Sequence, residues 1–380
     1  MTLPQGSATI SAIVPAETRF VTTQKARLSG IASAVCAIVF ASSVASAQSA
    51  FETHLPPVFP SNAGSCSICH SIPSTGGSSR ISIKRAQSKG AVGVTEGSVV
   101  IRSAADLASI ANDKIVVERL TTSIFGDGYV EAIDDKEIQE ALERQKLASH
   151  GKIAGHVVRV PALEADGAPL AIGKFGWKAQ HSSLLSFCSD AMLNELGIPT
   201  HLYPAILPPK SENEAALDKI VAFVRALPPP GRKEELASTA SAIQGEKIFT
   251  RIGCALCHVS MIRTFPPHTI VNGGTYAVPD QLGGKTIHPY SDFLLHDVGT
   301  GDGVLQAATP KYLEPITANM FRTSPLWGLR DRTRFIHDGR ATSVDDAIEQ
   351  HAGEASDVIA GYRNLSSKER ENLNQFLSSL

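Results

Sequence analysis

The sequence has little net charge, few aromatic side chains and few cysteines. Its 380 residues carry 35 Lys and Arg against 37 Asp and Glu, and the formal net charge of −2 provides no global field for nucleic acid or an anionic membrane. Six cysteines are too few for a disulfide-built scaffold of this length. Plentiful glycine (30) and proline (22) indicate a compact fold with much loop. At about 100–200 residues per domain, the length predicts two to three domains.

Long apolar runs are also scarce, with one exception near the N-terminus. Lys25 and Arg27 precede an almost uncharged run, 28–47, which ends in Ala45-Ser46-Ala47. A basic flank, an apolar stretch and a small-residue site in this order are typical of a secretory signal peptide. A single membrane anchor is the alternative, but the run is rich in Ser, Ala and Gly, and no later segment approaches ~20 apolar residues. We predict a signal peptide over residues 1–47 and no stable membrane insertion after its removal.

Four cysteines form two copies of the pattern C-x-x-C-H, at 66–70 and 254–258. Chance predicts roughly 0.003 occurrences of this pattern, which marks c-type haem attachment. The two thiols can bond the haem vinyl groups, and the adjacent imidazole can bind the iron. A thioredoxin-like dithiol would need no fixed histidine, and the 188 residues between the motifs are too many for a zinc ribbon. We therefore predict two covalently bound c-type haems, attached through Cys66, Cys69, Cys254 and Cys257, with His70 and His258 as iron ligands.

Two helix signals divide the chain. Ser211-x-x-Glu214 and Ser366-x-x-Glu369 are capping-box patterns, each followed by apolar residues at helical spacing. The run Pro228-Pro229-Pro230-Gly231 ends the first helix and indicates a stiff linker. We predict an N-terminal c-type haem domain over 48–228, a linker over 229–231, and a C-terminal cytochrome c domain over 232–380.

The expected fold class is mainly α, with two cytochrome c-like haem domains, long irregular loops and few short strands. Short strands are possible at 71–110 and around Gly273. Residues 119–126 resemble 322–328 when one gap is allowed, and this repeat indicates two related halves.

From about residue 60 onward, the chain resembles the bacterial di-haem oxidoreductases, often labelled thiol oxidoreductases, which are related to the di-haem cytochrome c peroxidases. The matching segments are Ser65–His70, Gly173–Ala179, Gly253–Val259, Pro289–Asp297, Arg322–Leu329, His337–Arg340 and His351–Ala355. The resemblance implies a periplasmic enzyme, secreted across the inner membrane.

The sixth ligand decides what each haem does, because a filled position favours electron transfer and an open one can bind peroxide. His351 is the leading candidate for the C-terminal iron. It follows Ser343, a predicted N-cap, and precedes Gly353, a predicted terminator, at the place where the peroxidases carry a methionine. A surface histidine and ligation by Met320 are the alternatives.

For the N-terminal iron, alignment of Ile138 with Ile348 places Ala141 where His351 lies, and alanine cannot bind iron. The N-terminal site is therefore expected to be open or water-occupied, although His150, His156 and His181 are possible ligands.

For several other polar and aromatic residues, the sequence allows more than one role. Trp177 can relay electrons between the haems or simply pack. Paired with aspartates, His296 and His337 can orient an imidazole or hold a haem propionate, and Arg340 can pair with a propionate. No catalytic acid–base residue can be assigned, and Glu131 and Glu137 are only nearby possibilities.

The residues and the resemblance together predict a periplasmic di-haem c-type cytochrome oxidoreductase of peroxidase-like activity. Electrons from a small soluble donor, a cytochrome or copper protein, would enter at the C-terminal haem and pass to an open N-terminal haem, where peroxide or another small oxidant is reduced. No nucleic acid partner is expected. The alternatives are a non-catalytic di-haem electron carrier, and an oxidase or oxygenase acting on an organic substrate.

Overall fold

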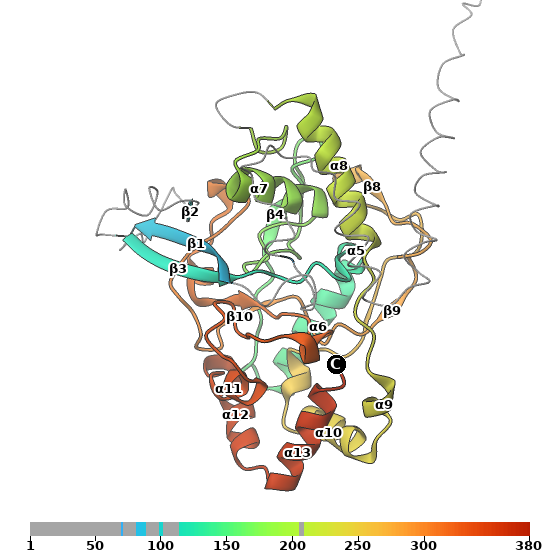
Figure 1. Cartoon of the computed structure of the whole chain (residues 1–380), viewed down its shortest axis with the longest axis vertical. Coiled ribbons are helices and arrows are strands. Elements are labelled where there is room, and N and C mark those ends of the chain that lie inside the picture. Colours follow the sequence, from blue (N-terminus) through green and yellow to red (C-terminus); the bar gives the residue numbers. More distant parts are fainter. Residues whose placement is uncertain (1–69, 71–80, 89–98, 102–113, 205–208) are drawn as a thin grey trace, which may run out of the picture.

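A computed structural model describes residues 70, 81–88, 99–101, 114–204 and 209–380 (Figure 1). The predicted signal peptide, Cys66 and Cys69 lie outside these residues. No helix among the described residues is long and apolar enough to cross a membrane.

Helices dominate the described chain, and the strands are mostly short. The α-helices are α5 (Asp127–Glu131), α6 (Asp135–Ala148), α7 (Leu184–Leu196), α8 (Ser211–Ala226), α9 (Glu234–Ala237), α10 (Ala240–Arg251), α11 (Val344–Glu349), α12 (Ser356–Arg363) and α13 (Ser367–Leu377). The 3-10 helices are η1 (Cys254–Leu256), η2 (Asn272–Gly274), η3 (Pro310–Tyr312), η4 (Pro315–Asn319), η5 (Leu329–Asp331) and η6 (Gly353–Ala355). The strands are β1 (Ile81–Ser88), β2 (Val99–Ile101), β3 (Lys114–Leu120), β4 (Arg159–Pro161), β5 (Leu170–Ile172), β6 (Ile262–Arg263), β7 (Ile270–Val271), β8 (Tyr276–Ala277), β9 (Thr286–Ile287), β10 (Leu295–His296) and β11 (Phe321–Arg322).

The strands form small antiparallel sheets between the helices. The described sheets have the orders β2-β1-β3, β4-β5, β6-β9, β7-β8 and β10-β11. The strands considered for 71–110 are present as β1 and β2, and those considered around Gly273 as β7 and β8. The expectation of a helix-rich fold with few short strands is thus confirmed for the described residues.

Two groups of helices occupy opposite ends of the molecule (Figure 1). At one end, α10 to α13 surround a core that includes Phe249, Tyr362 and Phe376. The larger core collects residues from both sides of 229–231, among them Leu217 from α8 and Ile262 from β6. The backbone of Ile133 also bridges that of Thr264. The two halves therefore share buried surface, and the predicted domain limits stay a prediction.

The repeat at 119–126 and 322–328 has a structural counterpart. Gly126 and Gly328 both adopt a left-handed backbone, with φ of 80° and 68°, at the start of a helical turn. The Gly126 amide donates to the carbonyl of Leu227, just after α8. The Gly328 amide donates in the same way to the carbonyl of Leu380, just after α13. Each half thus ties the same turn to the C-terminal end of a helix, α8 in one half and α13 in the other.

The helix caps are only partly as predicted. Ser366 forms the full capping box with Glu369 at α13, and Ser343 caps α11. The Ser211 box is wrong, because Lys210 is the N-cap of α8 and Ser211 lies inside the helix. Glu214 accepts hydrogen bonds from the backbone and ring nitrogens of His201 instead, at 2.8 and 2.6 Å.

Gly245 allows α10 to approach α13 closely, and this contact can be tested. A Cβ at this position would overlap the backbone carbonyl of Asn372 and lie 2.7 Å from the Phe376 Cβ. Because backbone cannot rotate away, we expect Gly245→Ala to destabilise the protein by about 1–3 kcal/mol in denaturant unfolding. Gly231→Ala is the matched control, since nothing lies within 4 Å of its added Cβ. Equal midpoints for the two variants would contradict the close contact.

Candidate functional site

The C-terminal C-x-x-C-H motif forms a tight turn at the end of α10. Gly253, with φ of 100°, starts the turn of η1, and the His258 amide donates to the carbonyl of Cys254 at 3.0 Å. As a result Cys254, Cys257 and His258 all line one cavity. The two sulfurs and the imidazole are therefore presented together.

The His258 ring is prepared as a neutral ligand. Its Nδ1 lies 2.9 Å from the carbonyl oxygen of Tyr290, and donation there leaves Nε2 as the free ligand atom. Burial lowers the pKa of His258 to about 4, so the ring is neutral near pH 7. A backbone carbonyl that accepts the other ring N–H and so fixes the tautomer is the usual partner of a metal-binding histidine.

His351 reaches the same cavity from a segment far along the chain. It lies just after α11, its amide bonded to the carbonyl of Ile348, and Gly353 follows with φ of 54°. The His351 Nδ1 is 2.7 Å from the carbonyl oxygen of Ala347, which again leaves Nε2 free. Burial lowers the pKa of His351, and its ring is close enough to contribute to the low pKa of His258. His258 and His351, both predicted as iron ligands, thus line the same cavity, and each ring has its Nδ1 bonded to a backbone carbonyl and a lowered pKa.

The cavity between them has a volume of about 220 Å³ and a mainly apolar wall. Helices α10 to α13 contribute Phe249, Val344, Ala347, Ile348, Val358, Ile359, Tyr362, Leu373 and Leu377. The charged lining side chains are Arg322, Arg332 and Arg334, and no carboxylate of the described chain lines the wall. Two thiols, two neutral imidazoles, an apolar wall and basic side chains fit a c-type haem with its two propionates.

The other predicted iron ligands lie elsewhere. Met320 does not line the cavity; it packs beside Val160 and Leu295, and its carbonyl accepts a hydrogen bond from Lys178. His70 is half-buried, but its motif partners lie outside the described residues, so the geometry of the first motif is not seen.

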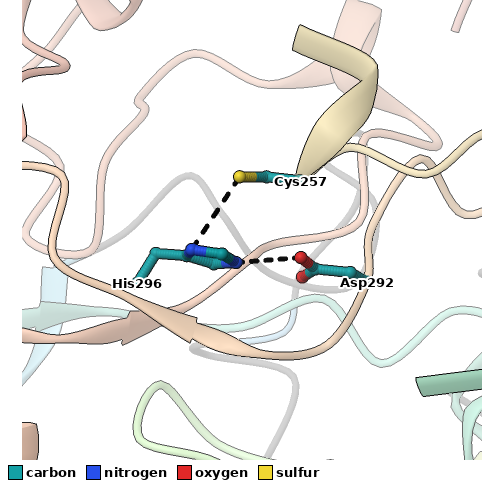
Figure 2. Close-up of side chains that lie close together, drawn as sticks. All are labelled: Cys257, Asp292 and His296. Atoms are coloured by element: carbon teal, nitrogen blue, oxygen red, sulfur yellow. Dashed lines mark hydrogen bonds and ion pairs between the residues drawn. The ribbon is translucent and has the colours of Figure 1, made fainter. Parts of the chain in front are cut away.

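His296 forms a buried charged network beside the turn of the C-terminal C-x-x-C-H motif (Figure 2). Its Nε2 is 2.8 Å from Asp292, its Nδ1 is 2.9 Å from Glu354, and the sulfur of Cys257 lies 3.8 Å from Nδ1. Burial by itself would lower the pKa of His296, but the charge of Asp292, followed by that of Cys257, raises it well above its usual range. Gln145 of α6 donates to Asp292 at 2.7 Å and to the carbonyl of Leu256 at 3.2 Å.

Cys257, Asp292 and His296 are close enough together to bind a metal ion. Both His296 nitrogens and the facing Asp292 oxygen already have partners, however, and the Cys257 sulfur is needed for the predicted thioether. The cluster therefore works as an orienting network, in which Asp292 and Glu354, rather than the adjacent Asp297, hold the His296 ring.

Trp177 and His337 form the aromatic edge of the cavity. His337 stacks on Phe321 with ring centroids 3.7 Å apart, and Trp177 meets both rings edge-on. The Trp177 Nε1–H donates to the carbonyl of Leu120 at 2.7 Å. Burial, followed by the charges of Arg119, Arg340 and Lys178, lowers the pKa of His337 to about 2. His337 is thus neutral, and Trp177 is held rigidly in the wall.

The two glutamates considered as acid–base groups are buried in ion pairs. Arg225 donates to both Glu131 oxygens at 2.6 and 3.0 Å, and the amide of Leu184 and the side chain of Asn272 add further donors. Glu137 is paired with Arg263 at 2.6 Å. Neither lines the cavity.

The histidines considered for the N-terminal iron also have partners or are exposed. The His156 Nε2 is 2.5 Å from Glu314, and the His181 ring contacts Ser186 and Asp190 at 2.9 and 3.5 Å. His150 is exposed, whereas Ala141 of α6 is buried.

Comparison with known proteins supports the haem interpretation. Residues 208–380 match the family described as "Di-haem oxidoreductase, putative peroxidase". This part of the chain is therefore similar to the di-haem oxidoreductases. The match contains Cys254, Cys257, His258 and His351, and it confirms the resemblance seen in the sequence.

Solved structures give more distant similarities. Hydrazine synthase from Kuenenia stuttgartiensis, studied under xenon, is 16% identical over 100% of both chains, with a TM-score of 0.44. A MauG-like protein associated with microbial copper homeostasis is 16% identical over 65% of this chain and 90% of its own, with a TM-score of 0.33. A search of curated proteins finds no significant match.

The structural role of Glu131 gives a prediction. Glu131→Gln leaves the Arg225 guanidinium without its charged partner, and we expect a loss of about 3–5 kcal/mol in unfolding free energy, with the specific activity of the folded fraction retained. Glu143→Gln is the control, since its pair with Lys146 is exposed and should contribute at most about 1 kcal/mol. A stable Glu131→Gln protein that has lost activity would instead make Glu131 an acid–base residue.

Proposed function

We propose that this protein is a periplasmic di-haem c-type oxidoreductase that reduces hydrogen peroxide with electrons from a small soluble donor. The observation that carries the proposal is the convergence of Cys254, Cys257, His258 and His351 on one apolar cavity. The family match of residues 208–380 supports the oxidoreductase activity.

Each cavity residue has a distinct task in this proposal. Cys254 and Cys257 provide the sulfurs for two thioether bonds, and His258 and His351 provide Nε2 on their two chain segments. The carbonyls of Tyr290 and Ala347 hold the Nδ1 protons and so keep each ring in the ligating tautomer. When bound, the iron supplies one-electron transfer and, where an axial position is open, peroxide binding.

In this proposal the two halves have different tasks, electron entry in the C-terminal half and peroxide reduction in the N-terminal half. His258 and His351 would hold the C-terminal iron, and that half would accept electrons from a cytochrome or copper protein. In the N-terminal half, buried Ala141 stands where His351 stands in the repeat, and His156 and His181 already have partners. These features support an open N-terminal site. There, each peroxide takes up two electrons and two protons and yields two waters.

The compartment follows from the sequence. The predicted signal peptide over 1–47 would deliver the chain across the inner membrane, where covalent haem attachment prevents loss of the cofactor. The near-neutral charge supports small-molecule and protein partners over nucleic acid.

Haem content tests the cofactor prediction directly. The mature protein, made with a cytochrome maturation system, is expected to have the mass of the chain plus two haems. Cys254→Ala combined with Cys257→Ala should retain one covalent haem, because both sulfurs of the second motif are lost. Cys188→Ala, outside both motifs, is the control and should retain two. A wild-type mass equal to that of the bare chain contradicts the proposal.

Paramagnetic resonance tests the ligands. We expect His351→Ala to lose the low-spin signal of the C-terminal haem, and His351→Met to raise its reduction potential, because a methionine ligand favours the reduced iron. His150→Ala, on the exposed surface, should leave the spectrum unchanged. Two low-spin haems in the wild type with no peroxide turnover would indicate an electron carrier. Oxidation of an organic compound with peroxide or O₂ would indicate the oxidase or oxygenase alternative.

A further inference from the structure

The charged part of the cavity wall is entirely basic within the described chain. Arg334 is exposed, but Arg322 is only 8% accessible and lies beside Arg332, whose Nε is inaccessible and has no hydrogen-bond partner among the described residues. The guanidinium groups of buried Arg322 and half-buried Arg332 thus line the same cavity as His258 and His351.

Neither arginine has a carboxylate partner in direct contact among the described residues. Arg322 donates to the carbonyls of Gly176 and Thr323 at 2.9 and 3.5 Å. Arg332 donates to the Ser324 hydroxyl at 3.4 Å. Its other bonds go to the carbonyls of Pro325 and Trp327, at 2.6 and 3.2 Å. These neutral groups satisfy N–H donors but leave both positive charges uncompensated.

Asp127 and Asp292, without direct contact, partly offset the positive charge of Arg322. No carboxylate of the described residues does so for Arg332. Burial lowers the pKa of Arg322 to about 10, against the opposing effect of Asp127 and Asp292. Burial raises the pKa of Asp127 to about 7, so it is only partly ionised near neutrality, and Asp292 is already engaged by His296 and Gln145. Burial and the repulsion of Arg322 lower the pKa of Arg332 to about 10.

Two neighbouring like charges, one buried and one half-buried, need an anion, because removing a charge from water without a partner is costly. We propose that Arg322 and Arg332 bind the propionate groups of the C-terminal haem. The inference rests on the proposed haem site. Planar guanidinium groups form paired hydrogen bonds with carboxylates, and an apolar group carrying two carboxylates matches a cavity that is apolar except for these arginines.

The residues considered from the sequence for this task are placed differently. Arg340 is exposed, pairs with Asp338 at 2.5 Å and does not line the cavity. His337 lines it, but the ring is neutral and stacked on Phe321. Neither supplies a buried positive charge.

The test compares Arg332→Gln and Arg332→Lys in the full-length mature holoprotein, with Arg340→Gln as the control. Haem mass is measured first: a wild type without two covalent haems refutes the proposed function itself. On loaded protein, the potential of the C-terminal haem is measured by redox titration, and its propionate bending bands by resonance Raman spectroscopy.

A positive charge near the iron favours the reduced state, so Arg332→Gln should lower the ratio of reduced to oxidised haem about tenfold at fixed potential, a shift of about 59 mV. Arg332→Lys keeps the charge but loses the planar fork, so its potential should stay near that of the wild type while its propionate bands shift. Arg340→Gln should change neither measurement.

If Arg332→Gln loads no haem, the Arg332→Lys variant decides alone. Propionate bands identical to those of the wild type in a loaded Arg332 variant overturn the inference, whereas shifted bands support it.

Discussion

The site depends on two buried imidazoles that are each kept neutral, with a single nitrogen available. A histidine in an apolar wall would turn or take up a proton unless its other nitrogen had a fixed partner. The backbone carbonyls of Tyr290 and Ala347 provide those partners. The loop at 289–297 must therefore pass beside the attachment turn, and α11 must end where Ala347 is one helical turn before His351. Much of the C-terminal architecture follows from these two hydrogen bonds.

The network around His296 joins the segments that carry the two ligands. Asp292 lies on the Tyr290 loop, Glu354 follows His351, and Gln145 reaches in from α6 of the N-terminal half to the attachment turn. The His296 imidazolium faces two carboxylates, so this network leaves no positive charge without a partner. The opposite condition holds at Arg322 and Arg332, where charge is left over. The wall thus has its paired charges around His296 and its unpaired charges at Arg322 and Arg332. In the proposed haem site, this difference would set the end of the cavity at which the two propionates lie.

Local chemistry could be predicted from the sequence, and long-range pairing could not. The C-x-x-C-H turn, the Ser343 and Ser366 caps and the position of His351 depend on residues a few places apart, and each is present. The Ser211 box failed because His201, ten residues upstream, takes Glu214. Glu131 was considered for proton transfer, but Arg225, ninety-four residues later, holds it. The proposed role of Arg332 has no local signal in the sequence, because it depends on the neutral groups that surround its side chain after folding.

The structural repeat explains why the two halves can differ while sharing one plan. Gly126 and Gly328 make the same turn and donate to the carbonyls of Leu227 and Leu380, which follow α8 and α13, and Arg119 and Arg322, at the start of the two repeats, are both buried. Within this common frame, the side chain at one position changed: alanine in α6, histidine after α11. Alanine costs the fold nothing there, because it packs in a buried helix face. It also removes a ligand. Under the proposed function, this difference of one side chain would leave the C-terminal iron with two histidine ligands and the N-terminal iron with an open position.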